Sequence, residues 1–254
     1  SRIKRLVQLN QKSKLRRTED VFLAEGVKMF LEAPREQLQE VYVSESFLEK
    51  CSCREHLGEV GYEVVSDSVF SKISDTCTPQ GVLCVLKQFH YNIEEMLRDK
   101  APLFLLLENI QDPGNLGTML RTGEGAGVSG IIMSRDTVDL YNPKVIRSTM
   151  GSIYRVPFYY ADDFAAAVHQ VQQAGVSVYA AHLRGKNSYA CQDYTKGTAF
   201  LIGNEGNGLR EETAELADCY IRIPMEGKVE SLNAAVASSI LMYEAHRQRA
   251  TIEK

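Results

Sequence analysis

The sequence predicts an α/β protein of two domains, the second built on a parallel sheet that helices cover on both faces. The chain has 254 residues, a length that suits two domains of modest size. A polar stretch, "KQFHYNIEEMLRDKAP", separates two halves of different pattern, so we place the boundary between Tyr91 and Ala101 and the domains at 1–95 and 100–254. From Leu103 onward, apolar strand-like runs alternate with helical patterns, which is typical of a parallel sheet.

The first half reads as a small mixed domain. Apolar residues recur at helical spacing in "VFLAEGVKMFLEA", whereas "LQEVYVS" and "YEVVS" have the pattern of short strands. In "TPQGVLCVL" a turn precedes a nearly unbroken apolar run, which predicts a buried strand that closes the domain.

The second half alternates regularly. The predicted strands are "LFLLLENI", "GIIMS", "RVPFYY", "VSVYAAHL", "TAFLIGN" and "YIRIPM". The predicted helices are "GNLGTMLRTGEGAG", "NPKVIRSTMG", "DDFAAAVHQVQQAG", "EETAELA" and "SLNAAVASSILMYEAHRQR". The sequence shows no internal repeat of fixed period.

Composition excludes several classes of protein. No apolar run approaches the roughly 18–20 residues of a membrane helix, so we expect no membrane partner. The N-terminus is basic and lacks the apolar core of a secretory signal, which favours a cytoplasmic location. One C-x-C pair lies near His56, but no second pair follows at zinc-finger spacing, so we expect no metal and reduced thiols. The cysteines are Cys51, Cys53, Cys77, Cys84, Cys191 and Cys219.

Charge is unevenly distributed along the chain. The formal net charge is −4, which argues mildly against a nucleic-acid partner. Residues 1–18 nevertheless contain no acid, and their basic residues are Arg2, Lys4, Arg5, Lys12, Lys14, Arg16 and Arg17. A basic arm on an acidic body suits a phosphate backbone, and the solvated face of a helix explains the same residues equally well.

Ligands of parallel sheets gather in loops at the carboxyl ends of strands. The first polar loop is "ENIQDPGNLGTMLRTGEGAG", in which Asp112 and Pro113 predict the cap and first turn of a helix. Asn115 and Arg121 would then lie near the mouth of this helix, where an arginine suits a phosphate or a developing oxyanion. A surface arginine on an ordinary helix is the alternative.

Two further loops have unusual contents. In "FLIGNEGNGLREE" the glycines allow close approach to the backbone and Glu205 stands among them, but their order differs from the dinucleotide fingerprint, which disfavours a nicotinamide cofactor. In "IPMEGKVESLNAAVASSILMYEA" a strand from Tyr220 to Met225 leads through a flexible loop to Ser231, a natural N-cap for the helix that follows.

Together the three loops resemble the SpoU (TrmH) branch of the SPOUT superfamily, RNA ribose 2′-O-methyltransferases that use S-adenosylmethionine. The first family motif matches Asn115 and Arg121, the second matches Gly203 to Gly208, and the third matches Ile223 to Met225 with Ser231 to Asn233. The stretch "NPKVIRSTMGSIYRVP" is similar to the segment between the first two motifs. The part before Tyr91 resembles the ribosomal-protein-like RNA-binding domain of rRNA-modifying members.

The resemblance implies methylation of a ribose in large-subunit ribosomal RNA without a metal, a deep trefoil knot, and a homodimer formed through the last helix. It implies catalytic roles for Asn115, Arg121, Glu205, Ser231 and Asn233. It implies cofactor contacts for Leu183, Gly203, Ile223, Met225 and Leu232, with glycine present because a side chain would collide with the cofactor. The expected RNA-binding residues are the basic arm with Lys144 and Arg147.

Two alternatives remain at this point. One is a transfer RNA methyltransferase of the same family, which the rRNA-type N-terminal domain disfavours. The other is an RNA-binding homologue without activity, and the presence of Asn115, Arg121, Glu205 and Asn233 argues against it.

Overall fold

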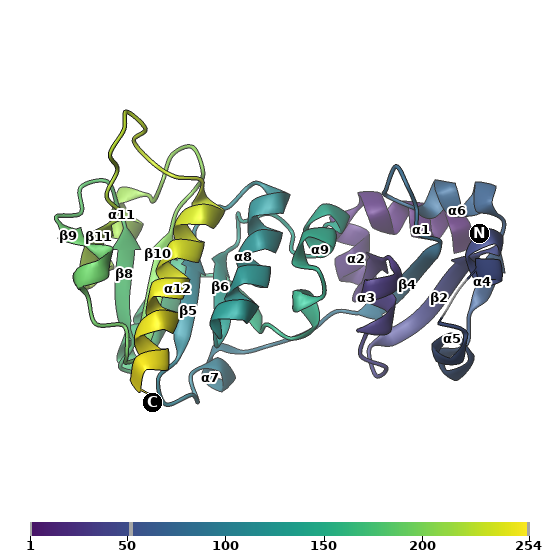
Figure 1. Ribbon diagram of the computed structural model, residues 1–254, viewed down its shortest axis with the longest axis horizontal. Helices are drawn as coiled ribbons and strands as arrows, with labels where there is room; N and C mark the ends of the chain where they lie inside the picture. The colour runs from purple at the N-terminus through teal and green to yellow at the C-terminus, as the bar shows by residue number, and fades with distance from the viewer. Residues whose placement is uncertain (1, 51–52, 253–254) are drawn as a thin grey trace. The chain divides into compact units, whose positions relative to one another are not determined.

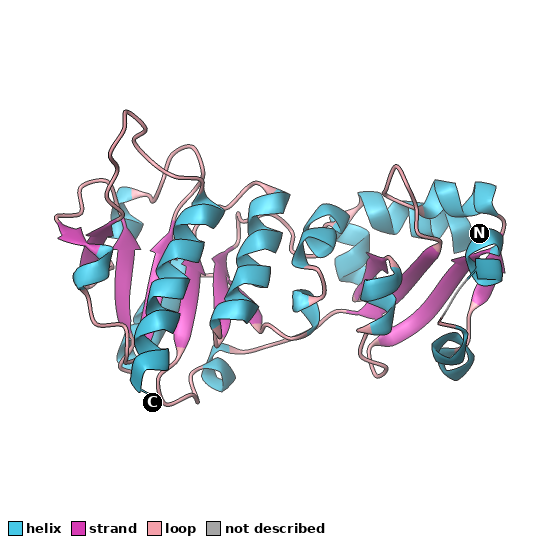
Figure 2. Cartoon of the chain, viewed as in Figure 1, coloured by secondary structure: helices cyan, strands magenta, loops and turns pink. Residues whose placement is uncertain are grey.

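The computed structural model describes residues 2–50 and 53–252 (Figures 1 and 2). The chain forms two compact units. The first contains the residues up to 89 together with 139–154, and the second contains 90–138 with the residues from 155 onward. Residues 139–154 therefore leave the second unit and pack with the first. Among the described residues, no helix is both long and apolar enough to cross a membrane.

The first unit is a four-stranded sheet with short helices. Strand β4 lies inside the sheet, in the order β1-β4-β2-β3, antiparallel to β1 and β2, while β2 and β3 are parallel. Its elements are α1 (Arg2–Gln11), α2 (Ser13–Glu19), β1 (Val21–Glu25), α3 (Val27–Leu31), β2 (Leu38–Ser44), α4 (Glu45–Lys50), α5 (Arg54–Val60), β3 (Glu63–Val65), α6 (Asp67–Ile73), β4 (Val82–Lys87), α9 (Pro143–Thr149) and η1 (Ser152–Tyr154).

The stretch "VFLAEGVKMFLEA" differs from its prediction as a helix. Its first five residues form β1, Gly26 turns the chain with φ +110°, and only Val27–Leu31 are helical. The Gly26 N–H donates to Val82 O at 3.0 Å, which continues the pairing of β1 with β4. The predicted strands in "LQEVYVS", "YEVVS" and "TPQGVLCVL" are confirmed as β2, β3 and β4.

Residues 139–154 contact the rest of the first unit through aromatic packing and an ion pair. The Tyr141 ring lies 4.8 Å from the Phe22 ring, between centroids. The Arg16 side chain is only 3% exposed and forms an ion pair with Asp139, with 2.6 Å between nitrogen and oxygen. It also donates to the carbonyl oxygens of Leu9 and Asn10. This segment and the N-terminal helices therefore share one buried polar contact.

The second unit is built on a seven-stranded sheet in the order β7-β6-β5-β10-β8-β11-β9. All its strand pairs are parallel, which confirms the predicted parallel sheet. The elements are α7 (Ile93–Met96), β5 (Leu103–Leu107), α8 (Pro113–Ala126), β6 (Gly130–Ser134), β7 (Phe158–Ala161), α10 (Phe164–Gln173), β8 (Ser177–Ala181), β9 (Asn187–Ser188), η2 (Tyr189–Cys191), β10 (Thr198–Ile202), α11 (Glu211–Ala214), β11 (Cys219–Arg222) and α12 (Ala234–Ile252).

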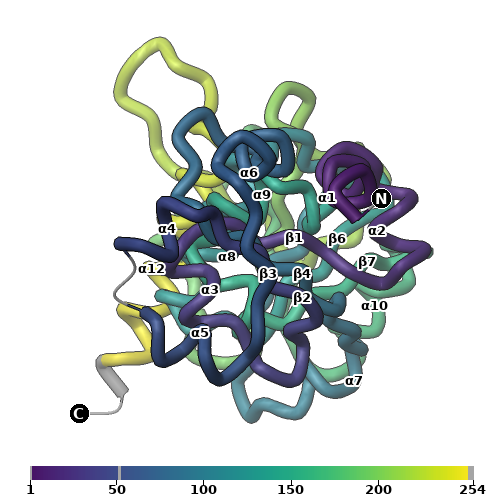
Figure 3. The backbone as a smooth tube through the Cα atoms, turned by 90° about the vertical axis from the view of Figure 1, so that its right-hand side faces the viewer, coloured from purple at the N-terminus to yellow at the C-terminus, as the bar shows by residue number. Residues whose placement is uncertain are grey.

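Helices cover both faces of this sheet. Val168 and Val171 of α10 pack on Phe104 and Leu106 of β5 at one face. Helices α8 and α12 lie against each other at the opposite face (Figure 3). The parallel strands all end at one edge of the sheet, so the loops that follow β5, β6 and β10 meet there.

Candidate active site

Helix α8 begins at this edge with a local capping motif. The Asp112 carboxylate accepts a hydrogen bond from the Asn115 backbone N–H at 2.7 Å, and Pro113 occupies the first turn. This confirms the predicted cap. Asn109, which follows β5, adopts a left-handed conformation with φ +53°, a conformation that asparagine tolerates better than most residues. The loop between β5 and α8 is short, and Asn115 lies in the first turn of α8.

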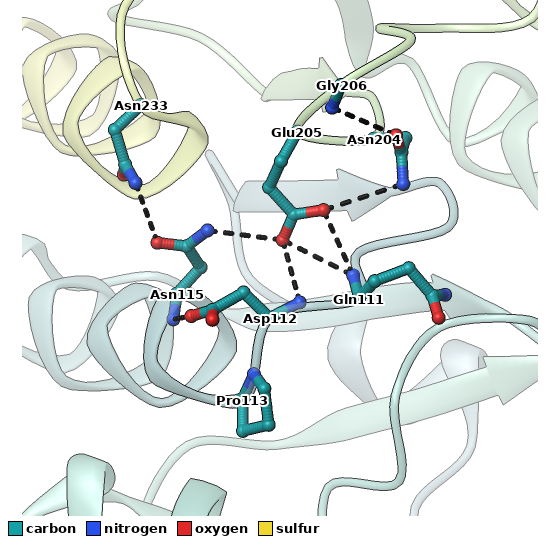
Figure 4. A pocket seen from close by; sticks show the side chains of 8 residues that line it. All are labelled: Gln111, Asp112, Pro113, Asn115, Asn204, Glu205, Gly206 and Asn233. Atoms are coloured by element: carbon teal, nitrogen blue, oxygen red, sulfur yellow. Dashed lines mark hydrogen bonds between the residues drawn. The ribbon is translucent and has the colours of Figure 1, made fainter.

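The glycine-rich loop after β10 is closed by its own backbone. Asn204 and Gly208 exchange two backbone hydrogen bonds, of 3.0 and 2.8 Å. The Asn204 side chain accepts from the backbone N–H groups of Gly206 and Asn207 and donates to Asn109 O at 2.8 Å. These contacts fix the loop beside the start of α8 and direct Glu205 toward it (Figure 4).

Glu205 binds the N-terminus of α8. Its Oε1 accepts from the Asp112 backbone N–H at 2.9 Å and from Asn115 Nδ2 at 3.1 Å, and its Oε2 accepts from the Gln111 N–H at 3.1 Å. Partial burial by itself would raise the pKa of Glu205. Hydrogen bonds from the N–H groups of Asp112, Glu205 and Gln111 and from Asn115 outweigh that burial and lower the pKa below its usual range. Glu205 is therefore an ionised acceptor at neutral pH.

Asn233 completes a chain of three polar side chains. It caps α12, because its Oδ1 accepts from the backbone N–H groups of Ala235 at 2.8 Å and Val236 at 3.2 Å. Its Nδ2 donates to Asn115 Oδ1 at 2.9 Å, and Asn115 in turn donates to Glu205. The prediction of Ser231 as the N-cap is therefore wrong, since the cap lies two residues further along the chain.

These side chains surround an open hollow of about 610 Å³. Figure 4 shows them converging from α8, the glycine-rich loop and α12. The described residues that line it are mostly acids and amides and include no cation: Gln111, Asp112, Pro113, Asn115, Asn204, Glu205, Gly206 and Asn233. The hollow can therefore donate and accept hydrogen bonds, but it supplies no positive side chain for a phosphate.

The structure brings together three of the five predicted catalytic residues. Asn115, Glu205 and Asn233 form the chain described above, whereas Arg121 and Ser231 do not line the hollow. Arg121 is exposed on α8, roughly 9 Å further along the helix axis than Asn115 and about 120° around it. Ser231 is exposed in the long loop between β11 and α12. The catalytic roles themselves stay predictions.

The residues expected to contact the cofactor follow three adjacent strands. Leu183 comes after β8, Gly203 comes after β10, and the loop after β11 contains Ile223, Met225 and Leu232. Strand β11 ends at Arg222 and is therefore shorter than the predicted strand from Tyr220 to Met225. Leu183 is 60% exposed. Their contacts with a cofactor stay predictions.

The reason for glycine at position 203 differs from the expected one. A Cβ atom added to Gly203 would lie 2.2 Å from the carbonyl carbon of Gly208 and 2.2 Å from the backbone nitrogen of Leu209. The chain's own backbone therefore excludes a side chain here, so a collision with a cofactor is not needed to explain the glycine.

The predicted RNA-binding residues fall into two groups. Arg2, Arg5 and Arg147 form ion pairs with carboxylates of the first unit, and Arg16 is buried against Asp139, so Arg16 is not available to a phosphate. Charge alone could not distinguish Arg16 from its neighbours. Arg2 is itself exposed, and the other exposed members of the set are Lys4, Lys12, Lys14, Arg17 and Lys144.

The described part of the chain contains no group of three or more His, Cys, Asp or Glu side chains that could hold a metal ion. Cys51, one member of the C-x-C pair, lies outside the described residues.

Sequence reasoning missed several polar residues of this edge. Gln111 and Asn204 line the hollow, and Glu108, Asp136, Arg210 and Thr213 form a network behind it. The one available signal is Glu108, a charged residue directly after the fully apolar run "LFLLL".

Two family models match the chain. The SpoU rRNA Methylase family matches residues 102–243, and the MRM3-like substrate binding domain matches residues 1–84. The first match includes all the residues of the hollow and all of the glycine-rich loop.

Individual relatives agree with these matches. The chain is 35% identical to the Bacillus subtilis 23S rRNA (guanosine(2553)-2'-O)-methyltransferase RlmP, over 71% of this chain and 70% of the relative. Among solved structures, an AdoMet-bound rRNA methyltransferase from Sinorhizobium meliloti is 31% identical, covers 96% of this chain and 94% of its own, and superposes with a TM-score of 0.83. The A. aeolicus TrmH/SpoU tRNA modifying enzyme is 30% identical but covers 63% of this chain and 81% of its own, with a TM-score of 0.56. This chain belongs to the SpoU rRNA methylase family.

Proposed function

We propose that this protein transfers a methyl group from S-adenosylmethionine to a ribose 2′-hydroxyl in large-subunit ribosomal RNA. The observation that carries the proposal is the chain of Asn233, Asn115 and Glu205 at the carboxyl edge of the parallel sheet, in a member of the SpoU family. We assign RNA binding to residues 1–95 and methyl transfer to 100–254, with the trefoil knot of the family in the latter.

Five residues are proposed to hold the cofactor: Leu183, Gly203, Ile223, Met225 and Leu232. Their chemistry fits the ligand, because apolar side chains suit an adenine ring and a methionine stem. Leu183 offers an exposed apolar surface at this place. When bound, S-adenosylmethionine supplies a methyl group that is already strongly electrophilic.

The polar chain is proposed to orient the ribose. The Asn115 amide is fixed at both ends, since its oxygen accepts from Asn233 and its nitrogen donates to Glu205. Such fixed groups hold a hydroxyl in line for transfer without reorganising during the reaction. Ser231 would join them from the loop before α12.

Glu205 is poorly suited to remove the hydroxyl proton. Its oxygens already accept hydrogen bonds from the start of α8, and these bonds lower its pKa, which makes it a weaker base than an ordinary glutamate. We therefore assign proton removal to water or an RNA phosphate oxygen. The Arg121 guanidinium would stabilise the developing alkoxide and bind the neighbouring phosphate through two parallel hydrogen bonds.

Five exposed cations of the first unit are proposed to bind RNA phosphates: Lys4, Lys12, Lys14, Arg17 and Lys144. Replacing Lys12, Lys14 and Arg17 by glutamine should reduce the salt dependence of RNA binding by about 0.7–0.9 in log–log slope for each phosphate that is no longer neutralised. Deleting the whole segment before Tyr91 is a poorer test, because residues 139–154 would lose Phe22 and Arg16 as packing partners. An unchanged slope in the triple variant would mean that these cations form only a solvated helix face.

A homodimer formed through α12 belongs to the same proposal. Val236 and Tyr243 of α12 are each 48% exposed. Residues seven apart lie on the same side of a helix, so together they offer an apolar strip. We also propose a cytoplasmic location.

Ribosomal RNA is favoured over transfer RNA by the extent of the matches. The Sinorhizobium meliloti rRNA methyltransferase covers both units of this chain, whereas the A. aeolicus tRNA modifying enzyme covers 63% of it. Residues 1–84 match the MRM3-like substrate binding domain, which supports the same choice.

The deciding experiment incubates the purified protein and labelled S-adenosylmethionine with ribosomal RNA and transfer RNA in parallel, followed by mapping of 2′-O-methyl sites. We expect label in large-subunit ribosomal RNA and none with Asn115→Ala. Label found only in transfer RNA would show that the substrate is transfer RNA and not ribosomal RNA. Calorimetry that detects no binding of S-adenosylmethionine would refute the proposed methyltransferase activity and favour an inactive RNA-binding homologue.

A further inference from the structure

A buried carboxylate close in sequence to the lining of the hollow has no part in the proposed reaction. Glu108 follows β5 directly, and its side chain is only 2% exposed. A buried carboxylate is strongly unfavourable unless hydrogen bonds satisfy its oxygens. The groups that donate hydrogen bonds to the Glu108 carboxylate therefore indicate the role of this residue.

The donors to the Glu108 carboxylate come from the segment that follows the glycine-rich loop. Its Oε2 accepts from the Arg210 backbone N–H at 2.8 Å, and its Oε1 accepts from Arg210 Nη1 at 3.4 Å and from Thr213 Oγ1 in α11. Glu108 therefore binds the chain just where the loop ends.

The other end of the loop is fixed by different contacts. Gly203 packs directly against the backbone of Gly208 and Leu209, and the Asn204 side chain donates to Asn109 O. Glu205 thus stands between two anchors, one formed by the loop itself and one formed by Glu108.

A second acidic residue extends the Glu108 anchor to the loop after β6. Asp136 pairs with the Arg210 guanidinium and accepts from Ser134 Oγ at 2.5 Å. The Gln111 side chain donates to Asp136 O at 2.5 Å. The loops after β5, β6 and β10 are therefore joined around Glu108 and Arg210.

We propose that Glu108 is a positioning residue that holds residues 203–210 so that the Glu205 carboxylate meets the N–H groups of Gln111 and Asp112 and the Asn115 amide. Its effect on catalysis rests on the proposed function, whereas its effect on the loop does not. Neutralising Glu108 weakens its bonds to the Arg210 backbone and to Thr213, so the loop is held less firmly and Glu205 contacts α8 less often, while Asp136 still pairs with Arg210.

Amide hydrogen exchange of Gln111 and Asp112 tests the positioning directly. In Glu108→Gln, which keeps the shape of the side chain, these two amides should exchange at least tenfold faster than in the parent, with strand amides of β5 and β10 unchanged. Thr213→Val, which removes one donor and keeps its volume, should give a smaller change in the same amides. If Glu108→Gln fails to fold, Thr213→Val decides the question.

Asp139→Asn is the matched control, because it neutralises another carboxylate paired with an arginine, in the first unit. It should leave the Gln111 and Asp112 amides unaffected. Unchanged exchange of both amides in Glu108→Gln and Thr213→Val, or equal acceleration in Asp139→Asn, would overturn the proposal.

Methyl transfer supplies the second readout. Misplacing a group of the site by about 1 Å can cost about a hundredfold in rate, so we expect a roughly tenfold to hundredfold fall in kcat/KM for Glu108→Gln. Because Glu108 acts through Glu205, the double variant with Glu205→Gln should be little worse than Glu205→Gln alone, and multiplied losses would contradict this. If the parent protein methylates no RNA, the proposed function fails and the exchange measurement still decides the role of Glu108.

Discussion

Replacing Gly203 by alanine should disrupt the loop that carries Glu205. The added Cβ atom would lie 2.2 Å from two backbone atoms, the Gly208 carbonyl carbon and the Leu209 nitrogen, and 2.5 Å from Gly208 O. An ordinary contact needs about 3.4 Å or more, so the backbone has to move by more than 1 Å. No side-chain rotation can relieve this collision.

The cost follows from what that movement breaks. Overpacking in protein interiors costs about 1–3 kcal/mol, and a collision with fixed backbone belongs at the upper end. The paired hydrogen bonds between Asn204 and Gly208 would be strained as well. We expect a loss of about 3 kcal/mol, which corresponds to a fall in Tm of roughly 6–12 °C for a chain of this size.

Two other glycines of the loop serve as matched controls. Gly208 has φ +69° and open space around its Cβ position, so Gly208→Ala should cost only the left-handed conformation, about 1–2 kcal/mol. Gly206 would place its Cβ 3.6 Å from Asn204 Oδ1, so Gly206→Ala should stay within about 0.5 kcal/mol of the parent. Thermal unfolding and calorimetry with S-adenosylmethionine should rank the three variants in this order. A Gly203→Ala protein with parental Tm that fails only to bind the cofactor would refute the reasoning and restore a direct steric role.

Three further predictions concern charged side chains. Arg121→Ala should lose most methyl transfer while keeping cofactor affinity, and Arg121→Lys should stay poorly active at every pH; near-parental activity of the lysine variant at alkaline pH would contradict this. Hydrogen bonds lower the pKa of Glu205 in the folded protein below the unfolded value of 4.5. The ionised carboxylate should therefore stabilise the fold fully above pH 4.5, and this contribution should disappear as the pH falls through the lower folded pKa. In urea unfolding, the unfolding free energy of Glu205→Gln should approach that of the parent only in acid. Arg249 of α12 donates to four backbone carbonyls, so Arg249→Met should lower the unfolding free energy by about 2–3 kcal/mol. Arg247 is 66% exposed, and its partner Glu244 keeps a hydrogen bond from Gln248, so Arg247→Met should change the unfolding free energy by less than about 1 kcal/mol.

Strands β5, β6 and β10 of the second unit were predictable because they are buried on both faces. Such strands read as nearly continuous apolar runs, and "LFLLL", "GIIMS" and "TAFLI" became β5, β6 and β10. The same property misled the prediction at "VFLAEGVKMFLEA", because a buried strand without alternation runs directly into the apolar face of α3. Strand β9 consists of Asn187 and Ser188, too few residues to give any pattern.

The sequence predicted only those features of the site that depend on residues close together in the chain. The cap formed by Asp112 and Pro113 depends on neighbouring residues, and the sequence indicated it correctly. The chain through Asn115 joins residues 90 and 118 positions apart, so only the resemblance to a family could associate them. Ser231 and Asn233 are both good caps, and the path of the preceding loop selects Asn233. Arg16 differs from the rest of the basic arm because its partner, Asp139, lies 123 positions away.

The position of Glu205 also constrains how the protein can recognise RNA. The N-terminus of a helix is a natural phosphate site, and α8 begins at the hollow. Here, however, the backbone N–H groups of Gln111 and Asp112 already bind the Glu205 carboxylate. A phosphate at this point would compete with a carboxylate held within the same unit and would meet its negative charge. Phosphate binding is therefore better assigned to cations outside the hollow, namely Arg121 further along α8 and the exposed lysines of the first unit. The hollow itself is left to hydrogen bonding of an uncharged group such as a ribose hydroxyl.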